Sequence, residues 1–149
     1  MDRRINVDLK ARTKDEAVNE LLDLLRGEHV DLDYEEVIRS VQSREEVENT
    51  SYGRGFAFPH ARTAAVNELY ILVGISKQGL EDKTPDDIPV HVICLLLTPS
   101  TIAKLYLQTL SGLATFARQP GILERVRGIN HNAELIRLVA DTGVSIDKE

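Results

Sequence analysis

Two runs of apolar residues decide the fold: Leu69-Tyr70-Ile71-Leu72-Val73-Gly74-Ile75-Ser76 and Val90-His91-Val92-Ile93-Cys94-Leu95-Leu96-Leu97. Both are rich in β-branched residues and apolar at nearly every position, which is typical of strands buried on both faces. The segment between them, residues 77–89, combines glycine and prolines with charged residues and is expected to be a surface loop. The two runs therefore predict the central strands of a sheet.

Helical patterns lie on both sides of these strands. Thr13 and Glu16 have the spacing of a capping box, which predicts a helix over residues 14–26 that Gly27 closes. Further helices are expected over about 34–43, from Pro99-Ser100 to Phe116, from Pro120 to Gly128, and from Asn132 to about Gly143. Because helices and strands alternate without a repeat, we expect one α/β domain, residues 1–149, with helices on both faces of the sheet.

The charge distribution argues against a nucleic-acid partner. The formal net charge is −6, and residues 1–50 hold 14 Asp and Glu against 8 Lys and Arg, whereas residues 51–149 hold 10 of each. Binding to a duplex depends on clustered cations that neutralise phosphates. No such cluster is present in either half of the sequence.

The sequence also indicates a cytoplasmic setting. No apolar run approaches the ~20 residues of a membrane-spanning helix, and the N-terminus lacks the apolar core of a secretory signal. The single cysteine, Cys94, cannot form an internal disulfide and is expected to be a small core residue. We therefore expect no direct membrane insertion.

Several kinds of enzyme site have no signature here. The sequence contains neither a Gly-x-x-x-x-Gly-Lys loop nor a full dinucleotide fingerprint, so a nucleotide cofactor is not expected. The four histidines, His29, His60, His91 and His131, are far apart in the sequence and have no cysteine partner, which disfavours a metal site. A serine hydrolase would lack its usual Gly-x-Ser-x-Gly motif.

His60 is the strongest candidate for a functional residue. Pro59 restricts the backbone before it, and Gly53 and Gly55 permit a close approach of the chain. Arg44, Arg54 and Arg62 supply cations that could bind a phosphoryl group. The residues from Arg44 to Arg62 are expected to form an irregular segment with an exposed backbone. A purely structural histidine in a loop is the alternative interpretation.

The chemistry of imidazole fits phosphoryl transfer. Its neutral form is well populated at physiological pH and is a good nucleophile toward phosphorus. Transfer between two protein side chains needs mainly alignment and positive charge at the phosphoryl oxygens. We therefore expect no cofactor and no metal. The other three histidines receive no chemical role, and His91 is expected to be a satisfied wall residue of its strand.

Nearly the whole chain resembles the enzyme IIA proteins of the bacterial phosphoenolpyruvate-dependent sugar phosphotransferase system, of the mannitol, fructose and nitrogen-regulatory types. The resemblance rests on Arg44-Glu45, Gly53-Arg54-Gly55, Phe56-Ala57-Phe58-Pro59-His60-Ala61-Arg62, Leu95-Leu96-Leu97-Thr98-Pro99 and Leu107-Gln108-Thr109-Leu110, in this order. It implies a mixed β-sheet sandwiched between helices on both faces. It also implies a phosphohistidine intermediate rather than a free-standing small-molecule enzyme.

The resemblance assigns roles to individual residues. His60 falls where the family histidine accepts a phosphoryl group from a histidine phosphocarrier protein and passes it to a cysteine of a sugar-specific IIB subunit. Arg44 falls where the family arginine contacts that group. Arg62, Thr50, Gly53 and Gly55 are expected to bind the phosphoryl group or to contact a partner.

One position departs from the family pattern. The family usually carries a second histidine on the helix that follows the turn at Pro99, and here Tyr106 takes its place. A tyrosine can donate a hydrogen bond but stays neutral, so stabilisation of phosphorylated His60 is expected to be weaker or different. The sequence therefore leaves two readings open: a phosphoryl carrier for sugar uptake or nitrogen-type regulation, and a module that controls a transporter or kinase by contact. A hydrolase that uses His60 as a base is a third, weaker alternative.

Overall fold

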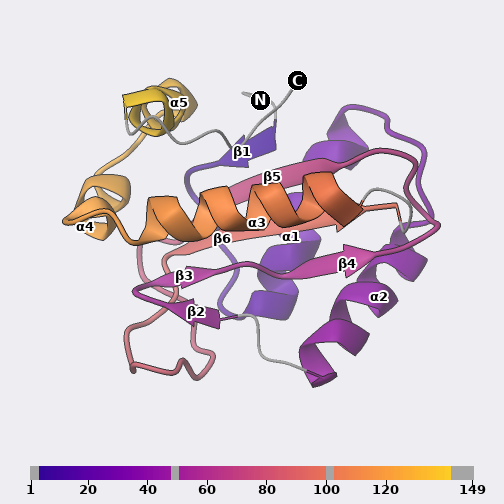
Figure 1. Cartoon of the computed structure of the whole chain (residues 1–149), viewed down its shortest axis with the longest axis horizontal. Helices are drawn as coiled ribbons and strands as arrows, with labels where there is room; N and C mark the ends of the chain where they lie inside the picture. Colours follow the sequence, from indigo (N-terminus) through magenta and orange to yellow (C-terminus); the bar gives the residue numbers. More distant parts are fainter. Residues whose placement is uncertain (1–3, 48–50, 100–102, 142–149) are drawn as a thin grey trace.

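A computed structural model describes residues 4–47, 51–99 and 103–141 of the chain. Its elements are β1 (Ile5–Asn6), α1 (Lys14–Gly27), α2 (Tyr34–Val47), β2 (Ser51–Gly53), β3 (Phe56–Ala57), β4 (His60–Arg62), β5 (Tyr70–Ile75), β6 (Val92–Thr98), α3 (Ala103–Ala117), α4 (Ile122–Arg127) and α5 (Asn132–Asp141). They form a six-stranded sheet in the order β1-β5-β6-β3-β2, with β4 also paired to β6. Helices lie on both sides of this sheet (Figure 1).

The two expected central strands are confirmed as β5 and β6. They pair antiparallel, with Tyr70 opposite Leu97 and Ile75 opposite Val92, and every residue of both strands is buried. The loop expected over residues 77–89 is confirmed. The sheet is mixed, because β1 runs parallel to β5 while β3 and β4 run parallel to β6.

The segment before His60 differs from its prediction as an irregular, exposed loop. Helix α2 continues to Val47, and three short strands follow from Ser51. Strands β3 and β4 keep one register along β6, with Phe56 opposite Val92 and His60 opposite Leu96. Pro59 between them has no N–H to donate, but its carbonyl accepts the Leu96 N–H at 3.0 Å. Pairing with a buried strand outweighed the local glycine and proline signals.

Side chains alternate between two cores, one on each face of the sheet. Phe56, Phe58 and Cys94 pack in the core beneath α3, α4 and α5. Ala57, Ala61 and every second residue of β6 from Ile93 to Leu97 pack in the core beneath α1 and α2. The α/β sandwich expected from the sequence is confirmed.

The helix starts were predicted better than the helix ends. Thr13 Oγ1 accepts the Glu16 N–H at 3.2 Å, and Asp33 Oδ1 accepts the Glu36 N–H at 3.1 Å. At the end of α1 the left-handed residue is His29, with φ of 61°, rather than Gly27. The expected boundaries at Ser100 and Gly143 lie outside the described residues, and the two-residue strand β1 has no local signal in the sequence.

Among the described residues, no helix is long and apolar enough to cross a membrane.

His91 is a buried wall residue, as expected. Its Nδ1 lies 2.8 Å from the Ser76 carbonyl oxygen, and the side chain sits in the β5–β6 connection. Burial lowers the pKa of His91; the hydrogen bond to Ser76 opposes this change, and the charge of Arg127 adds to it. The folded protein therefore favours neutral His91.

This shift predicts a pH-dependent stability. Because the folded pKa lies below the ordinary value of 6.5, the unfolded chain takes up the proton first as pH falls. The contribution of His91 is complete above that value and is lost as the pH falls toward the folded pKa. We expect His91→Asn, which keeps a donor for Ser76, to flatten the fall in the free energy of unfolding below about pH 6.5, measured by urea unfolding. His131→Asn, at an exposed site, is the control, and equal pH slopes in wild type and His91→Asn would contradict the prediction.

Candidate functional site

His60 begins β4 and shares the α3 face of the sheet with Phe56 and Phe58, because alternate residues of a strand point the same way. Its ring is half-buried, and Nδ1 lies 2.8 Å from the Phe58 carbonyl oxygen. A carbonyl can only accept, so Nδ1 carries the hydrogen in this arrangement. The lone pair therefore resides on Nε2, the ring atom with nucleophilic capacity.

Arg44 reaches this nitrogen from the last turn of α2. Its Nε lies 3.1 Å from Nε2 of His60. A guanidinium can only donate, so this contact requires the same tautomer as the contact with Phe58. Helix α2 runs beside β4 at one edge of the sheet, which brings the two residues together (Figure 1).

Tyr106 lies on α3, on the other side of the imidazole. The two ring centroids are 5.5 Å apart and the rings are tilted by 56°. Tyr106 is buried, whereas Arg62, two residues after His60, is exposed. The structure thus brings together four residues that the sequence had singled out: His60, Arg44, Tyr106 and Arg62.

These residues surround a pocket of about 400 Å³. Its lining consists of Ser40, Ser43, Arg44, His60, Ala61, Arg62 and Tyr106. The two serines were missed at the sequence level. The signal that could have found them is helical spacing, because Ser40 and Arg44 are four residues apart on α2 and share a face of that helix.

The glycine turn lies elsewhere. Gly53, the last residue of β2, has φ of 96°, and Gly55, in the turn to β3, has φ of 87°. Neither glycine lines the His60 pocket. His60 lies five residues after Gly55 along extended chain, which is about 16 Å. Asp86 accepts the Arg54 N–H at 2.7 Å and so holds this turn against the loop before β6. Thr50 lies outside the described residues.

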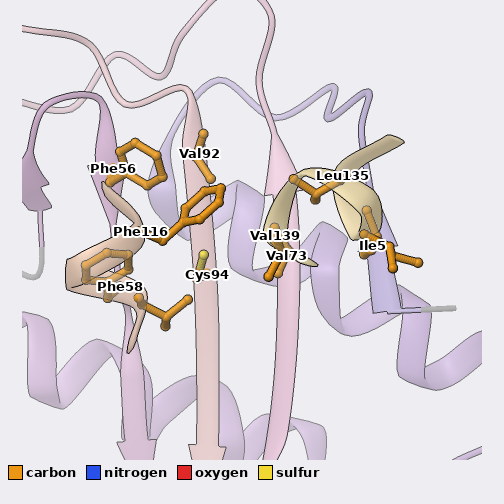
Figure 2. Close-up of a pocket in the computed structure, with 11 residues that line it drawn as sticks. Ile5, Phe56, Phe58, Val73, Val92, Cys94, Phe116, Leu135 and Val139 are labelled. Carbon is orange, nitrogen blue, oxygen red and sulfur yellow. The ribbon is translucent and has the colours of Figure 1, made fainter. Parts of the chain in front are cut away.

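A second cavity lies in the core between the sheet and helices α3 and α5, and its lining is apolar apart from the Cys94 thiol. It is about 20 Å³, which is space for about one water-sized sphere, and Figure 2 shows Phe56, Phe116 and Val92 on one side of it and Leu135 and Val139 on another. Burial raises the pKa of the Cys94 thiol at this cavity to about 12. Cys94 is therefore a core residue and not a nucleophile.

The remaining candidates do not form a second site. His29 and His131 are exposed and His91 is buried against Ser76. Among the described residues, no group of three or more His, Cys, Asp or Glu side chains could hold a metal ion. The chemistry of the described part of the chain is concentrated at His60.

The fold and the pocket define a class of protein. A mixed sheet lies between two helical layers and presents one histidine at its edge, and an arginine donates to the ring nitrogen that carries no hydrogen. The family described as phosphoenolpyruvate-dependent sugar phosphotransferase system, EIIA 2, matches residues 2–142, and the chain belongs to this family. It is therefore a phosphoryl-carrier component of the kind that serves sugar uptake or nitrogen regulation. The resemblance read from the sequence is confirmed.

Relatives of both types match the chain. The nitrogen regulatory protein of Escherichia coli strain K12 is 30% identical over 129 residues, which cover 83% of this chain and 76% of that protein. The fructose-specific EIIABC component of Bacillus subtilis is 25% identical over 122 residues, and although the match covers 82% of this chain it spans only 19% of that longer protein.

Solved structures give the same fold. The nitrogen regulatory protein IIA-Ntr from Neisseria meningitidis superposes with a TM-score of 0.84 at 26% identity, over 93% of this chain and 94% of that one. Enzyme IIA in a complex with phosphorylated enzyme IIB of the mannitol system from Escherichia coli gives a TM-score of 0.74 at 20% identity, over 95% and 96% of the two chains. The second likeness concerns the fold alone.

Substitution by alanine should destabilise the protein more at Gly55, in the turn before β3, than at Gly121, before α4. A Cβ on Gly55 would lie 2.7 Å from Leu123 Cδ2, whereas a Cβ on Gly121, with φ of 70°, would meet no atom within 4 Å. We expect Gly121→Ala to cost about 1–2 kcal/mol of unfolding free energy from backbone strain alone, and Gly55→Ala to cost about 1 kcal/mol more, because the end of the partly buried Leu123 side chain has to shift. Urea unfolding measures both. Equal losses would contradict the clash, and Leu123→Ala should recover part of the Gly55→Ala loss.

Proposed function

We propose that Nε2 of His60 accepts a phosphoryl group from a histidine phosphocarrier protein. The observation that carries the proposal is the pair of contacts on the ring, from Nδ1 to the Phe58 carbonyl and from Arg44 to Nε2. In the transfer, Nε2 forms a bond to phosphorus while the bond from phosphorus to the donor histidine breaks and that nitrogen takes the electron pair. The Nδ1 hydrogen remains on His60, and the Phe58 carbonyl stabilises the positive ring that results.

Arg44 has two successive tasks in this proposal. Before transfer its Nε–H donates to Nε2 and holds the ring, on the line along which phosphorus must approach. On transfer the guanidinium releases Nε2 and donates to the phosphoryl oxygens. A charge-assisted bond of this kind is among the strongest hydrogen bonds in proteins.

Other residues of the pocket complete the phosphoryl environment. Arg62 supplies a second cation, and the hydroxyls of Ser40 and Ser43 supply neutral donors from α2. The hydroxyl of Tyr106, on α3, donates a hydrogen bond to the phosphoryl group, and its side chain limits the approach of water to the His60 ring. The turn at Gly53 and Gly55, with Thr50, is assigned to partner contact rather than to the phosphoryl group.

The family supports a setting for this reaction. We place the chain, as one IIA-like domain over residues 1–149, in the cytoplasm, between a phosphocarrier protein and either a cysteine of a sugar-specific IIB subunit or a regulated transporter or kinase. The solved complex of a mannitol enzyme IIA with phosphorylated IIB supports the first type of partner, and the nitrogen regulatory relatives support the second. Neither nucleic acid nor a cofactor takes part.

Tyr106 favours one alternative function. A neutral phenol stands where the family usually has a histidine that can become a cation, so phosphorylated His60 has one positive charge fewer beside it. In the alternative, phosphotransfer has become inefficient and the domain acts on its target by contact.

The acceptor assignment predicts which variants can be labelled. With phosphoenolpyruvate, the first-stage kinase and the phosphocarrier present, wild type should gain one phosphoryl group by intact-mass spectrometry and His60→Ala none. His131→Ala should be labelled like wild type. Arg44→Met should slow labelling about 100-fold, because it removes a charged donor from the transition state. Labelled His60→Ala would refute the assignment.

The hydroxyl of Tyr106 should affect the lifetime of phosphorylated His60. We expect Tyr106→Phe to shorten its half-life about three- to tenfold, the value of one hydrogen bond, and Tyr106→His to lengthen it. Phosphorus NMR after removal of the phosphocarrier measures the decay. Equal half-lives in all three proteins would show that the residue has no such role. Rapid transfer from wild type to a IIB cysteine would exclude the contact-only alternative.

A further inference from the structure

Lys14, the first residue of α1, is a buried cation outside the pocket. Its side chain is only 8% exposed, and Nζ lies 3.0 Å from Glu45 Oε2 and 3.0 Å from Ser51 Oγ. Its backbone N–H donates to Asp82 Oδ1 at 2.7 Å, which anchors Lys14 to the loop before β6. Lysine is seldom buried to this extent unless its ammonium is paired.

Packing alone does not account for this ammonium. An unbranched apolar side chain of similar length would fill the same space without the cost of removing a charge from water, and buried ion pairs often stabilise no more than such a replacement. What an ammonium adds is three donors on one atom, which bind acceptors from different elements and so hold those elements together.

The two acceptors lead to the two halves of the His60 pocket. Glu45 follows Arg44 in the last turn of α2, so a bond to its carboxylate restrains the turn that carries the guanidinium. Ser51 begins β2 and pairs with Ala57 of β3, which lies three residues before His60, and β3 and β4 run along β6 in one register. One ammonium therefore connects the helix that carries Arg44 to β2, and through β3 to the chain segment that leads into β4 and His60.

We propose that Lys14 is a positioning residue for phosphoryl acceptance: by binding Glu45 and Ser51 it sets the distance between Arg44 and Nε2 of His60. The inference rests on the function proposed for His60. Arg44 is a long, exposed side chain at a helix end, and its contact with Nε2 depends on where that end is held. Displacements of about 1 Å in such a contact can change a rate by 10²-fold.

A double-mutant cycle tests whether Lys14 acts through Arg44. Lys14→Met should slow phosphorylation of His60 by about tenfold or more. In an Arg44→Met background the same change should have little further effect, because the residue that Lys14 positions is gone. Lys10→Met, which breaks an exposed pair with Asp8, is the matched control and should leave the rate unchanged. Additive losses from Lys14→Met and Arg44→Met would overturn the proposal.

A second readout is independent of the reaction. The nitrogen-15 chemical shift of Nε2 in His60 reports the hydrogen bond from Arg44. It should move in Lys14→Met toward the value in Arg44→Met and should return in Lys14→Arg, which restores a cation. If Lys14→Met fails to fold, Glu45→Gln keeps an acceptor oxygen for Nζ but removes the charge and should give a smaller change in the same direction. An unchanged shift in a folded Lys14 or Glu45 variant would refute the positioning role.

The two proposals fail differently. If wild type accepts no phosphoryl group, the function assigned to His60 fails, while the chemical shift still decides whether Lys14 controls the Arg44 contact. If wild type is labelled and the Lys14 variants are labelled at the same rate with the same shift, only the inference about Lys14 fails.

Discussion

The unbroken register between residues 56–62 and β6 is the constraint on which the site depends. Phe56 lies opposite Val92 and His60 opposite Leu96, with no shift across Pro59. A slip of one residue would turn His60 to the opposite face, away from Tyr106 and toward the core under α1 and α2. The same register places two phenylalanines in the core on the α3 side, so burial of those rings also fixes the side on which the imidazole emerges.

The pocket forms where the two helical layers meet at the edge of the sheet. Helix α2 belongs to one layer, through Val37 and Val41, and α3 belongs to the other, through Leu113 and Phe116. Arg44 from the first layer and Tyr106 from the second approach the same ring, because β4 lies at the edge beside α2 (Figure 1). A histidine on a central strand would be covered by one layer and screened from the other. The edge position therefore explains the mixed chemistry of the pocket.

The sequence predicted the parts of the fold that follow from local chemistry. Two continuously apolar runs rich in β-branched residues are typical of central strands, which are buried on both faces. The caps at Thr13 and Asp33 use side chains next to the groups that they cap. Strands β2, β3 and β4 are two or three residues long, too short for a periodic pattern, and their glycines and proline resemble those of a loop. Pairing with β6, more than thirty residues away, makes β3 and β4 strands, and β2 pairs in turn with β3.

The sequence by itself singled out His60 and Arg44 from residue types, and Tyr106 through the resemblance of its motifs to the family. It could not show which ring nitrogen of His60 carries the hydrogen or that Ser40 and Ser43 line the pocket. It also could not show that Gly53 and Gly55 lie outside the pocket. It also gave Lys14 no distinction from any other lysine at the start of a helix. These features were decided by the tertiary structure, because each depends on contacts between residues that are distant in the chain, and local patterns carry no information about such distances.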